Sequence, residues 1–280
     1  MGRRLYFNSS GVSDQIQSRQ VVTADSPWFC GHFPDQPVFP GVGVLDLLHS
    51  HLMNGSSSLH PGAWSLHHVR FRKPVLPNEE LRLSSAPTDH KGFLHAFRVR
   101  AADGHDATVC EGTFAFDGPG FADVIPPMPD PGAPPDLEVE RFIPHRDRMK
   151  LVDGIIKVDQ RQCIVSTRVR DSWPTALGND VSSIITIELI AQASAVLDGW
   201  NTRAGSPDKG WPMLVGVRKA MILCERMRVG QRLSITANQR VDSRNYKVFE
   251  GMVLADTRLI ATATIQAVDS GAKGGSWATN

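Results

Sequence analysis

His32 is the side chain in this sequence whose surroundings most clearly favour chemistry. It lies in residues 28–46, which read WFCGHFPDQPVFPGVGVLD, with glycine before the histidine and Phe33-Pro34 after it. A titratable ring in a tight, partly apolar loop suits proton transfer, because imidazole has an ordinary pKa of about 6.5. The loop ends at Pro40-Gly41, where we expect a helix to begin. Amides of a first helical turn, Gly41 among them, have no helical partner and can stabilise charge on a carbonyl oxygen.

Carboxyl groups on two expected helices are the natural partners of such a ring. Asp46 belongs to the first helix, expected at residues 41–53. The second helix, expected at residues 181–200, contains ITIELIAQASAV and places Glu188 and Gln192 on one face at positions i and i+4. Because the neighbours of Glu188 are apolar, we expect desolvation to raise its pKa and make it an acid, with Gln192 orienting the carboxyl.

The run from Gly31 to Val42 resembles the 3-hydroxyacyl-acyl-carrier-protein dehydratases of the FabA/FabZ type, whose signature is close to G-H-F-P-x-x-P-V-x-P-G-V. Residues 69–75, VRFRKPV, resemble the strand that follows the helix in that family. The resemblance implies a hotdog fold, a long helix wrapped by an antiparallel sheet. It also implies an acid six residues after the signature proline, where Asp46 stands, and a glutamine one turn later, where Ser50 stands instead.

The second half resembles the family in the parts that the first half lacks. Its I-E-L-x-A-Q helix resembles the dehydratase helix, and FIPHR at residues 142–146, followed by LVD at 151–153, resembles FabZ-like and ApeP-like hotdog proteins. The loop at 171–180 contains no histidine. We expect His145 to be a hydrogen-bonded structural residue.

In this family each site combines the histidine of one copy with the acid of the other. The resemblance therefore implies one working site per chain, with His32 as base and Glu188 as acid, supported by Gly41, Gln192 and Asp46. The implied reaction is dehydration of a 3-hydroxyacyl thioester to a trans-2-enoyl thioester, without metal or organic cofactor, the substrate being carried on phosphopantetheine.

Other functions of the same scaffold stay open at this point. A hotdog protein can be a non-catalytic acyl-carrier or acyl-thioester binding module, or a thioesterase. The D-x-N-P-x-H string of MaoC-type hydratases is absent, and Asp46-Leu47-Leu48-His49 does not match it. Isomerisation of the new double bond, the acyl chain, the choice between carrier protein and coenzyme A, and the pathway are not specified by the sequence.

Strand and helix patterns predict an α+β duplication, a double hotdog. We expect an N-terminal hotdog domain at 1–124, a proline-rich linker at 125–138, a C-terminal hotdog domain at 139–270 and a flexible tail at 271–280. Each half shows one helix beside a run of strands. Expected strands lie at 20–24, 64–71, 81–85, 93–100 and 108–116, then at 153–158, 163–169, 213–223, 232–241, 245–254 and 259–268. His49 and His51 could suggest a metal cluster, but their i, i+2 spacing puts them on different helix faces, so we expect solvated positions instead.

Composition limits the class of protein. A net charge of +1 argues against a nucleic-acid binder, and four scattered cysteines favour reduced thiols in a cytoplasmic protein. No apolar run is long enough to span a membrane. We expect an acidic acyl carrier protein to dock on basic residues, with the fused halves acting as a pseudo-dimer that can pair again; the candidates are Arg70, Arg72, Lys73, Arg218 and Lys219.

Overall fold

The computed structural model describes residues 16–55, 62–88, 94–116, 137–202, 212–243 and 245–269. Most of the predicted linker and all of the predicted tail lie outside these residues. Within the described part, no helix is long and apolar enough to cross a membrane. The four cysteines are all free thiols, and Cys110 and Cys163 are buried.

Each half places one long helix against antiparallel strands. Among its described residues, the N-terminal half contains helix α1 and five strands: β1 (Ile16–Val22), α1 (Gly41–Gly55), β2 (Trp64–Phe71), β3 (Glu79–Pro87), β4 (Leu94–Ala101) and β5 (Thr108–Ala115). The C-terminal half contains helix α2 and the remaining strands: β6 (Gly154–Val158), β7 (Gln162–Arg168), β8 (Ala176–Leu177), β9 (Asp180–Ser182), α2 (Thr186–Asn201), β10 (Pro212–Ile222), β11 (Arg226–Arg228), β12 (Arg232–Ser243), β13 (Tyr246–Ala255) and β14 (Arg258–Asp269). Short 3₁₀ turns lie at Pro27–Phe29, Val139–Arg141, Asp147–Met149 and Ser183–Ile185.

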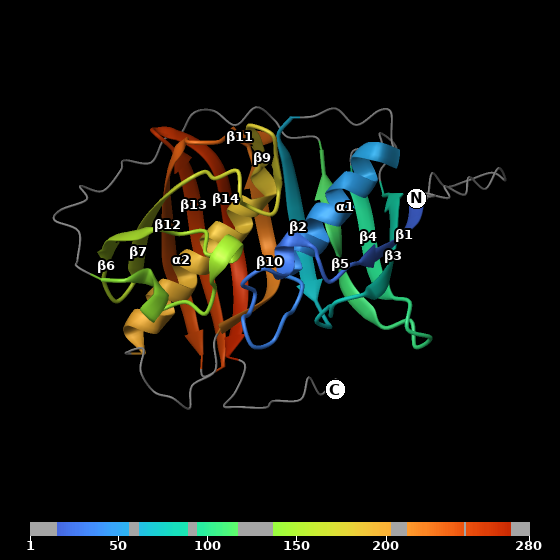
Figure 1. Cartoon of the computed structure of the whole chain (residues 1–280), viewed down its shortest axis with the longest axis horizontal. Coiled ribbons are helices and arrows are strands. Elements are labelled where there is room, and N and C mark those ends of the chain that lie inside the picture. Colours follow the sequence, from blue (N-terminus) through green and yellow to red (C-terminus); the bar gives the residue numbers. More distant parts are fainter. Residues whose placement is uncertain are drawn as a thin grey trace.

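The two halves share one continuous sheet. Its strand order is β1-β3-β4-β5-β2-β10-β14-β13-β12-β7-β6, and the halves join where β2 pairs with β10 in antiparallel register, from Gly216 opposite Arg70 to Ile222 opposite Trp64. Strands β8, β9 and β11 form a separate small sheet. Both helices cross the same face of the large sheet, α1 over the N-terminal strands and α2 over the C-terminal strands (Figure 1).

Side-chain alternation explains this arrangement. In β2, Trp64, Leu66 and Val69 are buried while Arg70 is exposed, so one face of the strand packs on the helix and the other faces solvent. Helix α2 is buried around nearly its whole circumference, as a helix wrapped by a curved sheet must be. The predicted α+β duplication is therefore present in the described residues.

Three local predictions were wrong. Helix α2 begins at Thr186 rather than 181, because β9 and a 3₁₀ turn capped by Ser182 occupy 180–185. The first strand spans Ile16–Val22 rather than 20–24. His51 is buried, with its ring bonded to the Ser18 hydroxyl (2.8 Å) and the Ile16 carbonyl (3.2 Å), and His49 packs 4.9 Å from the Trp64 ring, so these positions are not solvated.

Candidate active site

The loop that carries His32 is fastened to the C-terminal half. The amide of Arg146 donates to the Gly31 carbonyl (3.1 Å), and the amide of Met149 donates to the Cys30 carbonyl (3.2 Å). Gly31 has φ +93°, and a Cβ on it would lie 1.8 Å from the Arg146 carbonyl oxygen. Only glycine therefore permits this approach. The two half-domains meet here through their backbones.

His32 presents one ring nitrogen for chemistry. Its Nδ1 lies 2.8 Å from the Val38 carbonyl oxygen, which can only accept, so Nδ1 carries the hydrogen and Nε2 is left as a bare acceptor. The Phe33 ring stacks on the imidazole at 4.2 Å between centroids. Burial and, next, the neighbouring His145 lower the pKa of His32 to about 4, which keeps the ring neutral at pH 7.

Glu188 and Gln192 form a fixed pair on α2. Gln192 is fully buried; its Nε2 donates to the Met149 carbonyl (2.8 Å) and to Oε1 of Glu188 (3.2 Å), while its Oε1 accepts from the Leu151 amide (3.1 Å). These backbone contacts also settle which end of the amide is nitrogen. Glu188 is 4% exposed, so its carboxyl is held away from bulk water.

His145 completes the cluster. Its Nε2 lies 3.3 Å from Oε1 of Glu188, and its ring centroid lies 5.2 Å from that of His32. One nitrogen or oxygen from each of His32, His145 and Glu188 lies within 4.8 Å of the others. His145 is thus more than a structural hydrogen-bonding residue, because it touches the expected acid and lies beside the expected base.

The protonation predicted for Glu188 is wrong in direction. Burial does raise the pKa of this carboxyl, but the hydrogen bond and charge of His145, the charge of His32 and the Gln192 amide together lower it below its ordinary value. Apolar neighbours in the sequence indicate desolvation alone, whereas the hydrogen-bond partners that lower the pKa of Glu188 are brought to it only by the fold.

Comparisons with known proteins divide the chain as the structure does. A family model described as ApeI dehydratase matches residues 9–113, and one described as ApeP dehydratase matches residues 137–273. A 3-hydroxyacyl-[acyl-carrier-protein] dehydratase FabZ from Myxococcus xanthus is 37% identical over 109 residues, 36% of this chain and 70% of the relative. The chain belongs to the FabZ dehydratase family. The FabZ of Rhodospirillum rubrum is 36% identical over 103 residues, which cover 34% of this chain but only 63% of that relative.

Solved structures extend the likeness to the whole double hotdog. The dehydratase domain from the CurJ module of curacin polyketide synthase gives a TM-score of 0.72 at 11% identity, covering 96% of both chains. The dehydratase domain of RzxB from Pseudomonas fluorescens gives 0.68 at 12% identity, covering 90% of this chain and 94% of the other. At such identities the likeness concerns the fold, and it confirms the predicted double hotdog.

Gly41 and Asp46 are the remaining predicted support residues of this FabZ-family chain. Their described contacts are with residues other than His32, His145 and Glu188. Gly41 opens α1, and a Cβ on it would lie 2.8 Å from the Phe71 ring, so a larger residue there would have to displace that ring. Burial raises the pKa of Asp46 to about 6, against the opposing charge of Arg226. His49, one turn later, has its pKa lowered to about 4 by burial and by the same arginine. No histidine follows residue 145, so the C-terminal half has no other imidazole to offer Asp46.

The predicted docking cations differ in their partners. Arg72 donates to Glu111 (2.8 Å), Lys73 bonds Glu79 and Asp103, and Arg218 donates to the Tyr246 hydroxyl (3.1 Å). Arg70 and Lys219 are exposed and form no ion pair among the described residues. Because β2 and β10 are neighbours, both stand at the seam between the halves.

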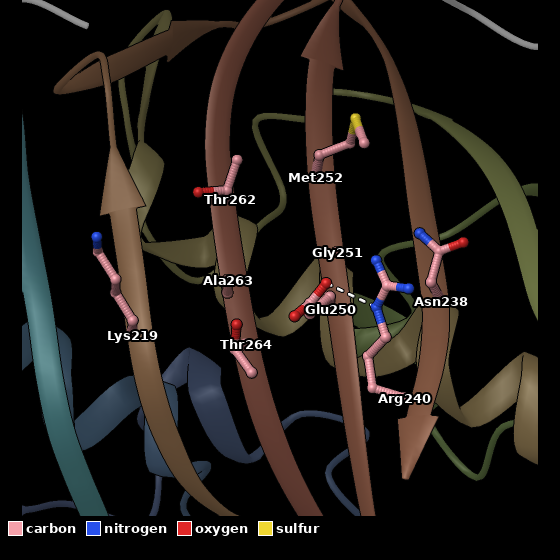
Figure 2. A pocket seen from close by; sticks show the side chains of 9 residues that line it. All are labelled: Lys219, Asn238, Arg240, Glu250, Gly251, Met252, Thr262, Ala263 and Thr264. Atoms are coloured by element: carbon pink, nitrogen blue, oxygen red, sulfur yellow. Dashed lines mark hydrogen bonds and ion pairs between the residues drawn. The ribbon is translucent and has the colours of Figure 1, made fainter. Parts of the chain in front are cut away.

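A groove on the other face of the sheet is separate from this cluster. Figure 2 shows its side chains standing on β10, β12, β13 and β14, on the side away from the helices, with Arg240 donating to Glu250 (2.7 Å). It contains none of the candidate catalytic residues; its lining is Lys219, Asn238, Arg240, Glu250, Gly251, Met252, Thr262, Ala263 and Thr264.

Proposed function

We propose that the chain dehydrates 3-hydroxyacyl thioesters, carried on an acyl carrier protein, to trans-2-enoyl thioesters. The supporting observation is the convergence of His32 from the N-terminal half and Glu188 from the C-terminal half in one buried cluster, within a FabZ-family chain. The names of its relatives specify an acyl-carrier-bound hydroxyacyl substrate for those proteins.

The base in this proposal is Nε2 of His32. The hydrogen on Nδ1 is held by the Val38 carbonyl, and the lowered pKa keeps Nε2 free of a proton at pH 7. Nε2 takes the proton from Cα, and the electron pair of that bond becomes the C2–C3 double bond. The thioester carbonyl gains charge in this step, and we assign its stabilisation to the Gly41 amide at the positive end of α1.

The acid in this proposal is the carboxyl of Glu188. Its lowered pKa leaves it ionised in the free site at pH 7, so it must take up a proton when the substrate binds. As the bond from C3 to its hydroxyl breaks, the carboxyl gives its proton to the departing oxygen and water leaves. Gln192 fixes Oε1 through a backbone-anchored amide, so the oxygen that meets substrate is Oε2, which has no partner among the described residues. His32 must then lose a proton and Glu188 regain one, which restores the site.

Carrier docking is assigned to the cations without ion-pair partners. Arg70 and Lys219 are exposed at the seam, whereas Arg72 and Lys73 have acidic partners that already use their charge. An acidic carrier surface is attracted most by cations that no neighbouring carboxylate neutralises. Reversing Arg70 and Lys219 to Glu should raise KM for a carrier-bound substrate, while a short carrier-free thioester is turned over as before.

Turnover of 3-hydroxyacyl thioesters tests the function directly. Loss of one water from the acyl group, followed by mass spectrometry, is the expected result for the native chain. His32→Ala and Glu188→Gln should each abolish it, and Asp46→Asn should be mild. Release of free acid would instead identify a thioesterase, and binding without turnover a carrier-binding scaffold. Strong loss from Asp46→Asn with little from Glu188→Gln would move the site to the other helix.

A further inference from the structure

His145 is the one member of the buried cluster to which the mechanism above gives no task. It is 7% exposed, lies close to both the base and the acid, and is the only histidine after residue 137. Its Nδ1 is buried and has no partner among the described residues. A buried polar atom costs stability unless it is bonded, so its retention here requires a reason beyond packing.

The hydrogen bonds around Glu188 determine which atoms carry hydrogens. Gln192 has two amide hydrogens, one for the Met149 carbonyl and one for Oε1 of Glu188. Oε1 therefore accepts from Gln192, and the lowered pKa of Glu188 leaves the carboxyl ionised in the free site. An ionised carboxylate can only accept, so the contact of His145 Nε2 with that same Oε1 is a hydrogen bond in which Nε2 donates. With two donors directed at Oε1, a proton taken up by Glu188 is best placed on Oε2.

We propose that His145 is a positioning residue of the dehydration site: together with Gln192 it holds Oε1 of Glu188, leaves Oε2 as the oxygen that serves the substrate, and couples the acid to the base. The inference rests on the proposed function and gives that site a third side chain. His145 touches Glu188 and acts through it, whereas His32 and Glu188 exchange protons with the substrate.

The coupling to the base has an electrostatic origin. Besides burial, His145 lowers the pKa of His32, while Glu188 and the Val38 carbonyl oppose the shift. The groups that act electrostatically on Glu188 are in turn His145 and His32, with Gln192 bonded to it. A neutral, non-titrating side chain at position 145 should therefore raise the pKa of His32.

The protein should fold without the His145 ring, because backbone and neighbouring groups hold this segment in place. The amides of Arg146 and Met149 bond the His32 loop, and the Arg146 guanidinium donates to the carbonyls of Ile143 (2.8 Å), His145 (2.8 Å) and Glu140 (3.2 Å). None of these bonds uses the imidazole. Substitution of the ring thus removes the contact to Glu188 while leaving the loop docked.

Two substitutions of His145 separate positioning from titration. His145→Gln keeps an N–H donor that can reach Oε1 but cannot titrate, whereas His145→Phe fills the space with no donor. We expect His145→Phe to lower kcat at least about tenfold with little change in KM, and His145→Gln to recover much of that loss. Both should move the acidic limb of the kcat/KM profile to higher pH. The matched control is His51→Gln, which alters a buried, hydrogen-bonded histidine of the other half.

NMR titration of the His32 ring tests the coupling independently of turnover. The midpoint should lie near pH 4 in the native chain and higher in His145→Gln and His145→Phe. An unmoved midpoint and an unmoved acidic limb would overturn the coupling, and native kcat in His145→Phe would overturn the positioning role. If the native chain turned over no hydroxyacyl thioester while the midpoint still moved, the proposed function would fail but the coupling would stand.

Discussion

Gly31 is the position at which a single methyl group should separate the two halves of the site. Gly31→Ala places a Cβ 1.8 Å from the Arg146 carbonyl oxygen, at a backbone φ of +93° that alanine rarely adopts. The obstacle is main chain, so no side-chain rotation relieves it. The His32 loop must shift away from residues 146–149 or the segment must move with it.

The expected cost is set by two local effects. A non-glycine residue in such a conformation costs about 1–3 kcal/mol. The bonds from the Arg146 and Met149 amides to the loop, each worth about 1 kcal/mol net, oppose undocking. The conformational cost alone shifts the docking equilibrium by roughly one to two orders of magnitude, and the main-chain overlap at 1.8 Å adds to that shift.

Activity and amide exchange measured together distinguish undocking from global unfolding. We expect Gly31→Ala to lose at least about tenfold in kcat/KM and to lose hydrogen-exchange protection at the Arg146 and Met149 amides, while α2 stays protected. The control is Gly104→Ala, since Gly104 has φ +85° and no atom within 4 Å of an added Cβ. It carries the conformational cost without the clash and should keep full activity. Native turnover and protection in Gly31→Ala would refute the reasoning.

Three further outcomes concern charge. The folded pKa of Asp46, about 6, lies above its ordinary 3.8, so ionisation destabilises the fold; this destabilisation is absent below about pH 4 and complete above about pH 6. Asp46→Asn should therefore raise the unfolding free energy by about 3 kcal/mol at pH 7 and by little at pH 4, measured by denaturant titration. Lys247→Met should destabilise by about 3–5 kcal/mol because it leaves the buried Asp198 carboxylate without its partner, and adding Asp198→Leu should recover most of that loss in thermal melts. A chelator alone should leave turnover unchanged. Added Zn²⁺ should inhibit turnover reversibly, because His32, His145 and Glu188 together offer two imidazoles and one carboxylate that can bind it and are then blocked for proton transfer. Activation by Zn²⁺ would contradict the acid–base assignment.

Strand and helix periodicity predicted most of the fold, and it was least accurate where the pattern is weak. The β1 segment, IQSRQVV, pairs only with β3 at the edge of the sheet and exposes most of its side chains, so its alternation is incomplete. The residues 176–185 contain two very short strands and a 3₁₀ turn, which leave no periodic signal before α2. The long elements with one buried face were located within a few residues.

The site was only partly accessible to sequence reasoning. His32 and Glu188 are separated by most of the chain, and their pairing came from a family resemblance rather than from spacing. The position of His145 beside Glu188 was missed because it depends on backbone bonds from 146 and 149 to Cys30 and Gly31, which no local pattern encodes. One signal was present, since His145 is the only imidazole that the C-terminal half possesses.

That single histidine also explains why the fused halves differ. A reciprocal site would need an imidazole from the C-terminal half facing Asp46, yet His145 is already bonded to Glu188 of its own half. Asp46 is left with a pKa raised by burial, the opposing charge of Arg226 and no hydrogen bond among the described residues. A working reciprocal site would require a histidine in the 171–180 loop together with a glycine that lets this loop approach the opposite half.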